Sequence, residues 1–172
     1  MRRLLLIGRS EAGKTTLMQR LRGEIPHYEK TQAVYAGQWI IDTPGEYCQT
    51  AQYGKALALY AYEADVVGIV ISADEPYTLF SPGIASLVNR EVIGIITGTD
   101  KPGAHVALCE SWLRLSGCRH IFRVCSKTGE GVLALLDYLN TDAKAPEKQG
   151  KTSDSVPAPM TDDRVGSDGN RP

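Results

Sequence analysis

The 172-residue sequence lacks an apolar run of 18 residues, so no segment is long enough to cross a membrane as a helix. Its four cysteines show no Cys-x-x-Cys or Cys/His spacing, which argues against a structural metal site and favours reduced cysteines in a cytoplasmic protein. The formal net charge is only −1, so there is no excess of basic residues to attract nucleic acid or an anionic membrane.

What the sequence does contain is an alternation of short apolar strands with amphipathic helices. Strands are expected at 3–7, 33–35, 39–41, 66–71, 92–96 and 121–124, and helices at 14–23, 51–63, 105–116 and 132–139. The pair 33–35 and 39–41 reads as a hairpin. This order predicts an α/β fold: a doubly wound, mostly parallel sheet of about six strands, with right-handed crossovers and flanking helices.

The composition changes after residue 141. Residues 142–172 hold four prolines, and their only sizeable apolar residues are Val156, Met160 and Val165. Such a segment cannot bury enough apolar surface to order itself. We therefore expect one domain over 1–141 and a disordered tail over 142–172.

The stretch from residue 8 to residue 15 reads G-x-x-x-x-G-K-T, between an expected strand and an expected helix. In a phosphate-binding loop of this spacing, Gly8 and Gly13 let the backbone curl so that its N–H groups point at phosphate oxygens. Lys14 then reaches the β- and γ-phosphates, and the Thr15 hydroxyl binds Mg²⁺. The alternative is a glycine-rich turn with a surface lysine. The residues expected to bind nucleotide here are Gly8, Arg9, Ser10, Glu11, Ala12, Gly13, Lys14, Thr15 and Thr16.

A second motif, Asp42-Thr43-Pro44-Gly45, follows the strand at 39–41. An acidic residue at the carboxyl end of a strand is where a second Mg²⁺ contact is expected in a phosphate-loop protein. The backbone N–H of Gly45 would then sense the γ-phosphate. On its own the motif is also compatible with an ordinary turn.

These motifs, together with Cys125-Ser126-Lys127, resemble the small Ras-like GTPases. More narrowly, residues 8–17, Lys30-Thr31-Gln32 and residues 41–47 look like the EutP/PduV family. These are small phosphate-loop NTPases encoded with bacterial microcompartments for ethanolamine and propanediol utilisation. The resemblance extends over roughly residues 1–140 and leaves out the tail.

The resemblance implies roles for residues that spacing alone does not assign. Asp42 would bind Mg²⁺ through water, and Thr31 would close over both Mg²⁺ and the γ-phosphate. Ser126 and Lys127 would approach the guanine oxygen. Glu46 stands where many Ras-like proteins place the glutamine that orients the attacking water. Its carboxylate could orient water or act as a base, or it could be a solvated turn residue, and hydrolysis should be slow.

The loop that reads guanine in this family departs from its usual N-K-x-D pattern and reads Thr97-Gly98-Thr99-Asp100. Asp100 can still accept two hydrogen bonds from the guanine edge, which adenine does not offer. The Thr97 hydroxyl can bond to the base or to the phosphate loop. Gly98 cannot supply the aliphatic stem of a lysine, so affinity should be weaker, with guanine still favoured over adenine.

The sequence thus predicts an Mg²⁺-dependent protein that binds GTP or GDP and hydrolyses GTP slowly, with Lys14, Thr31, Gly45 and Glu46 as its catalytic residues. It would act as a switch or assembly factor in the cytoplasm, with microcompartment shell or enzyme proteins as partners. One alternative is a kinase that transfers phosphate from ATP to acetate, for which Arg9 is the nearest additional cation. The other is a module that binds nucleotide without turning it over.

Overall fold

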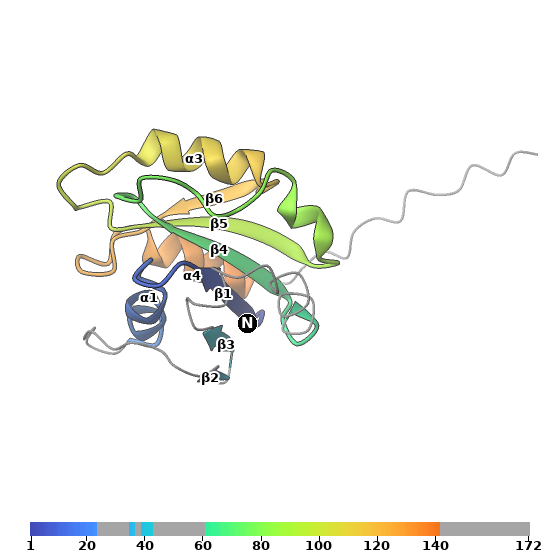
Figure 1. The fold of residues 1–172 in the computed structure, drawn as a ribbon. Helices are drawn as coiled ribbons and strands as arrows, with labels where there is room; N and C mark the ends of the chain where they lie inside the picture. The colour runs from blue at the N-terminus through green and yellow to red at the C-terminus, as the bar shows by residue number, and fades with distance from the viewer. Residues whose placement is uncertain (24–34, 37–38, 43–60, 142–172) are drawn as a thin grey trace, which may run out of the picture. The chain divides into compact units, whose positions relative to one another are not determined.

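The computed structural model describes residues 1–23, 35–36, 39–42 and 61–141 (Figure 1). The helix expected at 51–63 lies outside these ranges except for its last residues, and so does the expected disordered tail at 142–172. The elements in chain order are β1 (Leu4–Gly8), α1 (Lys14–Leu21), β2 (Tyr35–Ala36), β3 (Ile40–Asp42), β4 (Val66–Ser72), the 3₁₀ helix η2 (Ile84–Leu87), β5 (Glu91–Thr97), α3 (Val106–Leu115), β6 (His120–Arg123) and α4 (Val132–Asn140).

The strands form one six-stranded sheet in the order β2-β3-β1-β4-β5-β6. The strands β3, β1, β4, β5 and β6 all run parallel, and β2 pairs antiparallel with β3 at the edge as the first arm of the expected hairpin. Every residue of β1 and β4 is buried, as expected for central parallel strands covered on both faces. The predicted doubly wound α/β fold is confirmed.

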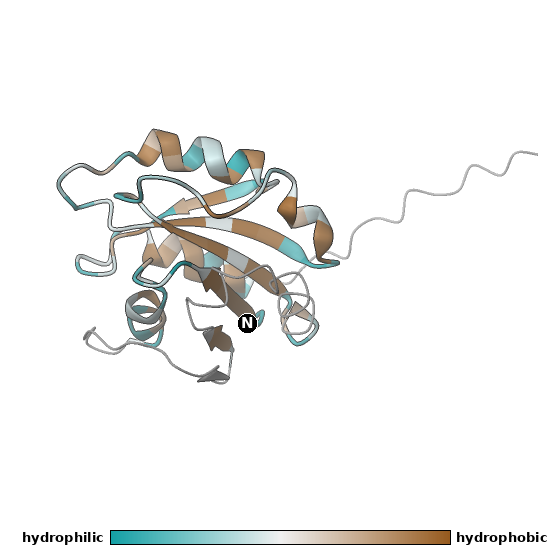
Figure 2. Ribbon diagram, viewed as in Figure 1, coloured by the Kyte–Doolittle hydropathy of each residue, from teal (hydrophilic) through white to brown (hydrophobic). Residues whose placement is uncertain are grey.

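Each face of the sheet has its own apolar core, because successive residues of a strand point to opposite sides. Leu4 and Leu6 pack with α1 and α4, whereas Leu5 and Ile7 pack on the α3 side. Figure 1 shows α3 on one side of the sheet and α1 and α4 on the other, and Figure 2 shows the apolar strands between these layers.

The inward face predicted for the 105–116 helix is confirmed. Cys109 and Leu113 of α3 are fully buried, and Val106 and Trp112 pack against the same core half-buried. Within the described ranges, no helix has the length and apolar character that a bilayer span requires.

The fold brings the expected motifs to one edge of the sheet. The loops after β1, β5 and β6 begin at the carboxyl ends of their strands, and β3 ends at Asp42, whose backbone lies in register with Leu6 of β1. The chain leaves β1 for β3 on one side and later returns to β4 on the other. A ligand site is expected outside the strand ends at such a switch point.

Candidate functional site

The side chain of Lys14 is folded into the loop between β1 and α1. Its ammonium donates to the carbonyl oxygens of Gly8, at 2.9 Å, and of Arg9, at 2.8 Å, and the residue is only 5% exposed. The loop therefore holds a positive charge at its centre, at the start of a helix whose N-terminus also favours anions.

The curl of this loop differs in one respect from the sequence-based expectation. The left-handed residues are Gly13, with φ of 82°, and Glu11, with φ of 67°. A positive φ is uncommon for a residue with a side chain, and such conformations concentrate at functional sites. Gly8 is needed for a different reason: a Cβ there would lie 2.5 Å from the carbonyl oxygen of Val70, on the neighbouring strand.

Thr97, at the end of β5, ties the phosphate loop to the loop that carries Asp100. Its buried hydroxyl donates to the carbonyl oxygen of Ala12 at 2.6 Å. Of the two partners that the sequence left open for this hydroxyl, the base and the phosphate loop, the structure shows the second. The bond fixes the distance between the two loops.

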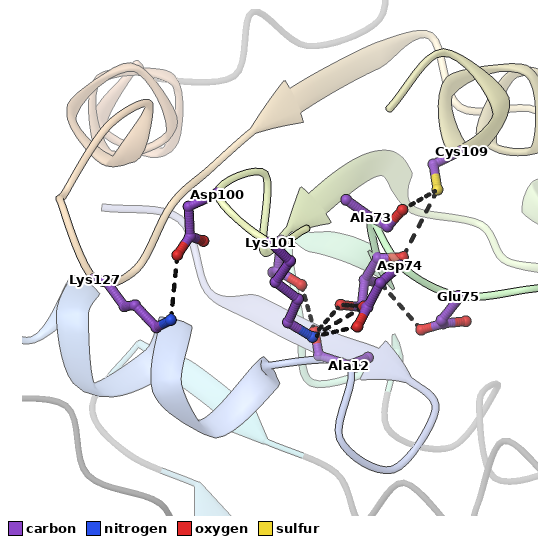
Figure 3. A network of polar contacts seen from close by, with 10 residues as sticks. Ala12, Ala73, Asp74, Glu75, Asp100, Lys101, Cys109 and Lys127 are labelled. Atoms are coloured by element: carbon purple, nitrogen blue, oxygen red, sulfur yellow. Dashed lines mark hydrogen bonds and ion pairs between the residues drawn. The ribbon is translucent and has the colours of Figure 1, made fainter. Parts of the chain in front are cut away.

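Asp100 and Lys127 face each other from the loops after β5 and β6 (Figure 3). The Lys127 ammonium lies 3.2 Å from Asp100 Oδ2, and this interaction holds the pKa of the Asp100 carboxyl below its usual value. Asp100 is therefore a carboxylate, and hence a hydrogen-bond acceptor, at neutral pH. Ser126, beside Lys127, is buried. The structure thus brings these three residues close to the edge that holds the phosphate loop.

Asp74 and Lys101, which the sequence analysis did not single out, also lie at this edge. The Lys101 ammonium lies 2.9 Å from both carboxylate oxygens of Asp74 and 3.0 Å from the hydroxyl of Ser72 (Figure 3). The hydroxyl of Ser72 donates to Asp74, and this bond is the main reason that the pKa of Asp74 is lowered. Their positions just after β4 and β5 were the available signal, since strand ends of a parallel sheet meet there.

Glu75 is a nearly buried carboxylate on the same edge. Its Oε1 accepts a hydrogen bond from the backbone N–H of Ser72 at 3.0 Å. Burial raises the pKa of Glu75, although the positive charges of Arg9 and Lys14 act in the opposite direction. The guanidinium of Arg9 lies over the ring of Tyr77, 5.0 Å from its centre. Arg9 is thus a cation of the phosphate loop whose side chain is held over Tyr77.

The raised pKa of Glu75 predicts a pH-dependent effect of Glu75→Gln on stability. Glu75 favours the folded state while it is protonated, below its ordinary pKa in the unfolded chain. This contribution is lost as the pH rises through the raised folded-state value, since the folded protein then holds a desolvated charge. The amide keeps an oxygen for the Ser72 N–H without that charge.

Thermal unfolding of Glu75→Gln at pH 7.5 should therefore occur at a higher temperature than that of the parent, and the difference should shrink towards pH 4. The exposed Glu63→Gln serves as the control and should show no such trend. A Glu75→Gln protein that is less stable than the parent at pH 7.5 would contradict this reading of the carboxylate.

Two residues at this edge are of the types that bind a magnesium ion. Thr15 lies in the first turn of α1 and the backbone of Asp42 lies beside β1. A hydroxyl and a carboxylate are hard oxygen ligands, and Mg²⁺ completes its shell with waters and phosphate oxygens. Among the described residues, no group of three or more His, Cys, Asp or Glu could hold a metal by itself. Thr31, Gly45 and Glu46 lie outside the described residues.

Solved structures with this fold include two proteins in complex with GDP. A variant of Era from Aquifex aeolicus, bound to GDP·AlF₄⁻, superposes with a TM-score of 0.56 at 19% identity, over 80% of this chain and 55% of that one. Roco2 of Methanosarcina barkeri, bound to GDP, has a TM-score of 0.58 at 17% identity, over 80% of this chain and 47% of that one. At this identity the likeness shows the fold alone.

Sequence relatives are more specific. The chain is 42% identical to the propanediol utilization protein PduV of Citrobacter freundii over 141 residues, 81% of this chain and 94% of PduV. It is 34% identical to the probable acetate kinase EutP of Escherichia coli K12 over 158 residues, 90% of this chain and 99% of EutP. The profile of the PduV-EutP family, described as ethanolamine utilisation – propanediol utilisation, matches residues 1–141. The chain therefore belongs to the PduV-EutP family.

Proposed function

We propose that this protein binds guanine nucleotides with Mg²⁺ and hydrolyses GTP slowly. The observation that carries the proposal is the hydrogen bond from Thr97 to Ala12, which joins the phosphate loop to the loop of Asp100. It makes a single site with a cation at one end, Lys14, and a carboxylate acceptor at the other. A ligand that suits both ends has phosphates and a base edge with two adjacent donors, which guanine offers.

Each residue then has a defined part in binding. The loop backbone and Lys14 bind the β- and γ-phosphates, and Asp100 accepts from the guanine edge, with Ser126 and Lys127 beside the base. Thr15, Asp42 and Thr31 would hold Mg²⁺, which when bound would neutralise charge on the phosphates. Gly45 contacts the γ-phosphate, and Glu46 orients the attacking water. We expect slow turnover, because a carboxylate beside a γ-phosphate is repelled by it.

The family of the chain supports a role in ethanolamine or propanediol utilisation. We propose that the protein acts there as a switch or assembly factor of a bacterial microcompartment pathway. It would lie in the cytoplasm or at the microcompartment and have shell or enzyme proteins as partners.

A second candidate function is phosphoryl transfer from ATP to a small carboxylic acid. It is favoured by the relatives that are named probable acetate kinases. An acetate oxygen would attack the γ-phosphorus, the bond to the bridging oxygen would break, and acetyl phosphate and ADP would leave. Arg9, a phosphate-loop residue whose guanidinium lies over Tyr77, is the cation placed to bind such an acid. A module that binds nucleotide without turnover is the third possibility.

One incubation separates these functions. The full chain is mixed with Mg²⁺ and either GTP or ATP, with and without acetate, and the products are separated. Inorganic phosphate from GTP, independent of acetate, supports the proposed hydrolysis. Acetyl phosphate formed only with ATP and acetate would show that the protein is the kinase instead. Nucleotide that is bound but unchanged would show that the protein binds nucleotide without turning it over.

Asp42→Ala tests the proposed magnesium site. Turnover should fall by about tenfold or more, because mutating a residue that supports a metal site typically costs at least about tenfold in activity. Triphosphate binding should lose its dependence on Mg²⁺, measured by titration in EDTA and in excess Mg²⁺, whereas diphosphate binding should change less. The exposed Asp65→Ala, at the opposite end of the strands, is the control. Parent-like turnover of Asp42→Ala would rule out this role.

A further inference from the structure

The side chain of Lys101 occupies the space beside Gly98 that a side chain at residue 98 would need. A Cβ built on Gly98 would lie 3.0 Å from both Cδ and Cε of Lys101 and 3.3 Å from Ser72 Oγ. Gly98 also has φ of 63°, which strains any other residue. The absence of a side chain at 98 is therefore what lets the aliphatic stem of Lys101 lie where it does.

The stem is held there by its charged end. The ammonium is fixed by Asp74 and Ser72 at the end of β4, through contacts of 2.9 to 3.0 Å. Because lysine otherwise has many rotamers, three acceptor atoms at this distance place the stem against the backbone of the β5 loop. The side chain is 38% exposed, so it is not sealed inside the protein.

This stem lies next to the group that would read the base. Lys101 directly follows Asp100, and the same loop is tied to the phosphate loop through Thr97. A purine ring needs hydrogen-bond partners at its edge and an apolar or cationic surface at its face. Asp100 supplies the first, and the methylene groups of Lys101 are placed to supply the second.

We propose that Lys101 is the residue on which the purine ring of the bound nucleotide packs, replacing the stem that Gly98 lacks. This inference rests on the proposed function, since it concerns the base half of the same site. In this proposal Lys101 packs equally well on the ring face of either purine, whereas Asp100 distinguishes guanine from adenine.

The test compares Lys101→Ala, which removes the stem, with Lys101→Met, which keeps an apolar stem and removes the charge. Affinities of the full chain for GDP, ADP and inorganic tripolyphosphate are measured by calorimetry. Lys101→Ala should bind GDP about tenfold more weakly, which is 1.4 kcal/mol. Lys101→Met keeps an apolar stem but loses the anchor at Asp74 and Ser72, so its loss of affinity should be smaller than that of Lys101→Ala but measurable. The exposed Arg119→Ala controls for the lost charge.

Tripolyphosphate has no base, so its affinity should be equal in Lys101→Ala and the parent. The ratio of GDP to ADP affinity should also stay within about threefold, since both purines share the ring face. Parent-like GDP binding by Lys101→Ala, or equal losses for GDP and tripolyphosphate, would overturn the inference. So would a Met variant as weak as the Ala variant. If the parent binds ADP but not GDP, the proposed guanine preference is wrong. The packing role of Lys101 is then tested by the change in ADP affinity that Lys101→Ala causes.

Discussion

Lys14→Ala should weaken binding of GDP and GTP by at least about thirtyfold, because removing one member of a buried charge pair costs about 2 kcal/mol or more. In the free protein the Lys14 ammonium is already directed into the loop by the carbonyls of Gly8 and Arg9. A phosphate that enters the loop therefore meets a charge that needs no further ordering. The measurement is calorimetry with each nucleotide at constant Mg²⁺.

Two further variants make this result specific. Lys14→Met fills the buried space without donating a hydrogen bond and should lose binding to the same degree. Arg22→Ala removes an exposed positive charge next to the last turn of α1 and should bind as the parent does. All variants should keep the circular dichroism spectrum of the parent, because the sheet does not depend on this side chain. Nucleotide affinity unchanged in Lys14→Ala would remove the phosphate-loop assignment.

Asp100→Asn should reverse the base preference of the site. In the proposed complex the carboxylate of Asp100 would accept from the N1–H and the 2-amino group of guanine, whereas an amide would turn a donor towards one of them. We expect GDP binding to fall by at least about tenfold, the loss of one charge-assisted hydrogen bond. Xanthosine diphosphate, which carries an oxygen in place of the 2-amino group, should gain by a similar factor. Competition between the two nucleotides for one labelled ligand measures the reversal directly.

The ion pair with Lys127 bears on the interpretation of this variant. The pair is open to water, with the Lys127 side chain 76% exposed, so breaking it should have little effect on folding. Lys127→Ala is therefore the matched control: it frees Asp100 without changing its charge and should not bring in xanthosine diphosphate. Equal effects of Asp100→Asn on GTP and ATP would show that Asp100 does not read the base. The kinase using ATP would then be the better proposal.

Much of this fold could be predicted because its signals are local. The apolar runs that became β1, β4 and β5 are long enough to be recognised as buried strands, and G-x-x-x-x-G-K-T places a loop between strand and helix. The bounds of some strands differ from the prediction by one residue: β6 was expected at 121–124 and lies at His120–Arg123. The helix α1 ends at Leu21 with Arg22 as its C-cap, and Gly23, the glycine at which the sequence predicted the helix to stop, follows with a left-handed φ of 75°.

The parts of the site that sequence reasoning missed depend on contacts between distant residues. Asp74 and Lys101 are separated by 27 positions and meet only because β4 and β5 are neighbours. The left-handed conformation of Glu11 could not be predicted from the sequence either. A glutamate rarely adopts a positive φ, so the surrounding loop must impose this conformation. The sequence indicated which loops meet, but the partners within each loop follow from the sheet register.

The bond between Thr97 and Ala12 has a thermodynamic consequence for the proposed ligand. Because one hydroxyl restrains both loops, any fragment that orders one of them lowers the entropy cost of ordering the other. Free energies measured for a nucleoside and for an inorganic polyphosphate are then not independent quantities, and each fragment raises the affinity for the other by the same factor. The intact nucleotide gains from this coupling in addition to the contacts that its two ends make, because the loops are ordered once for both ends.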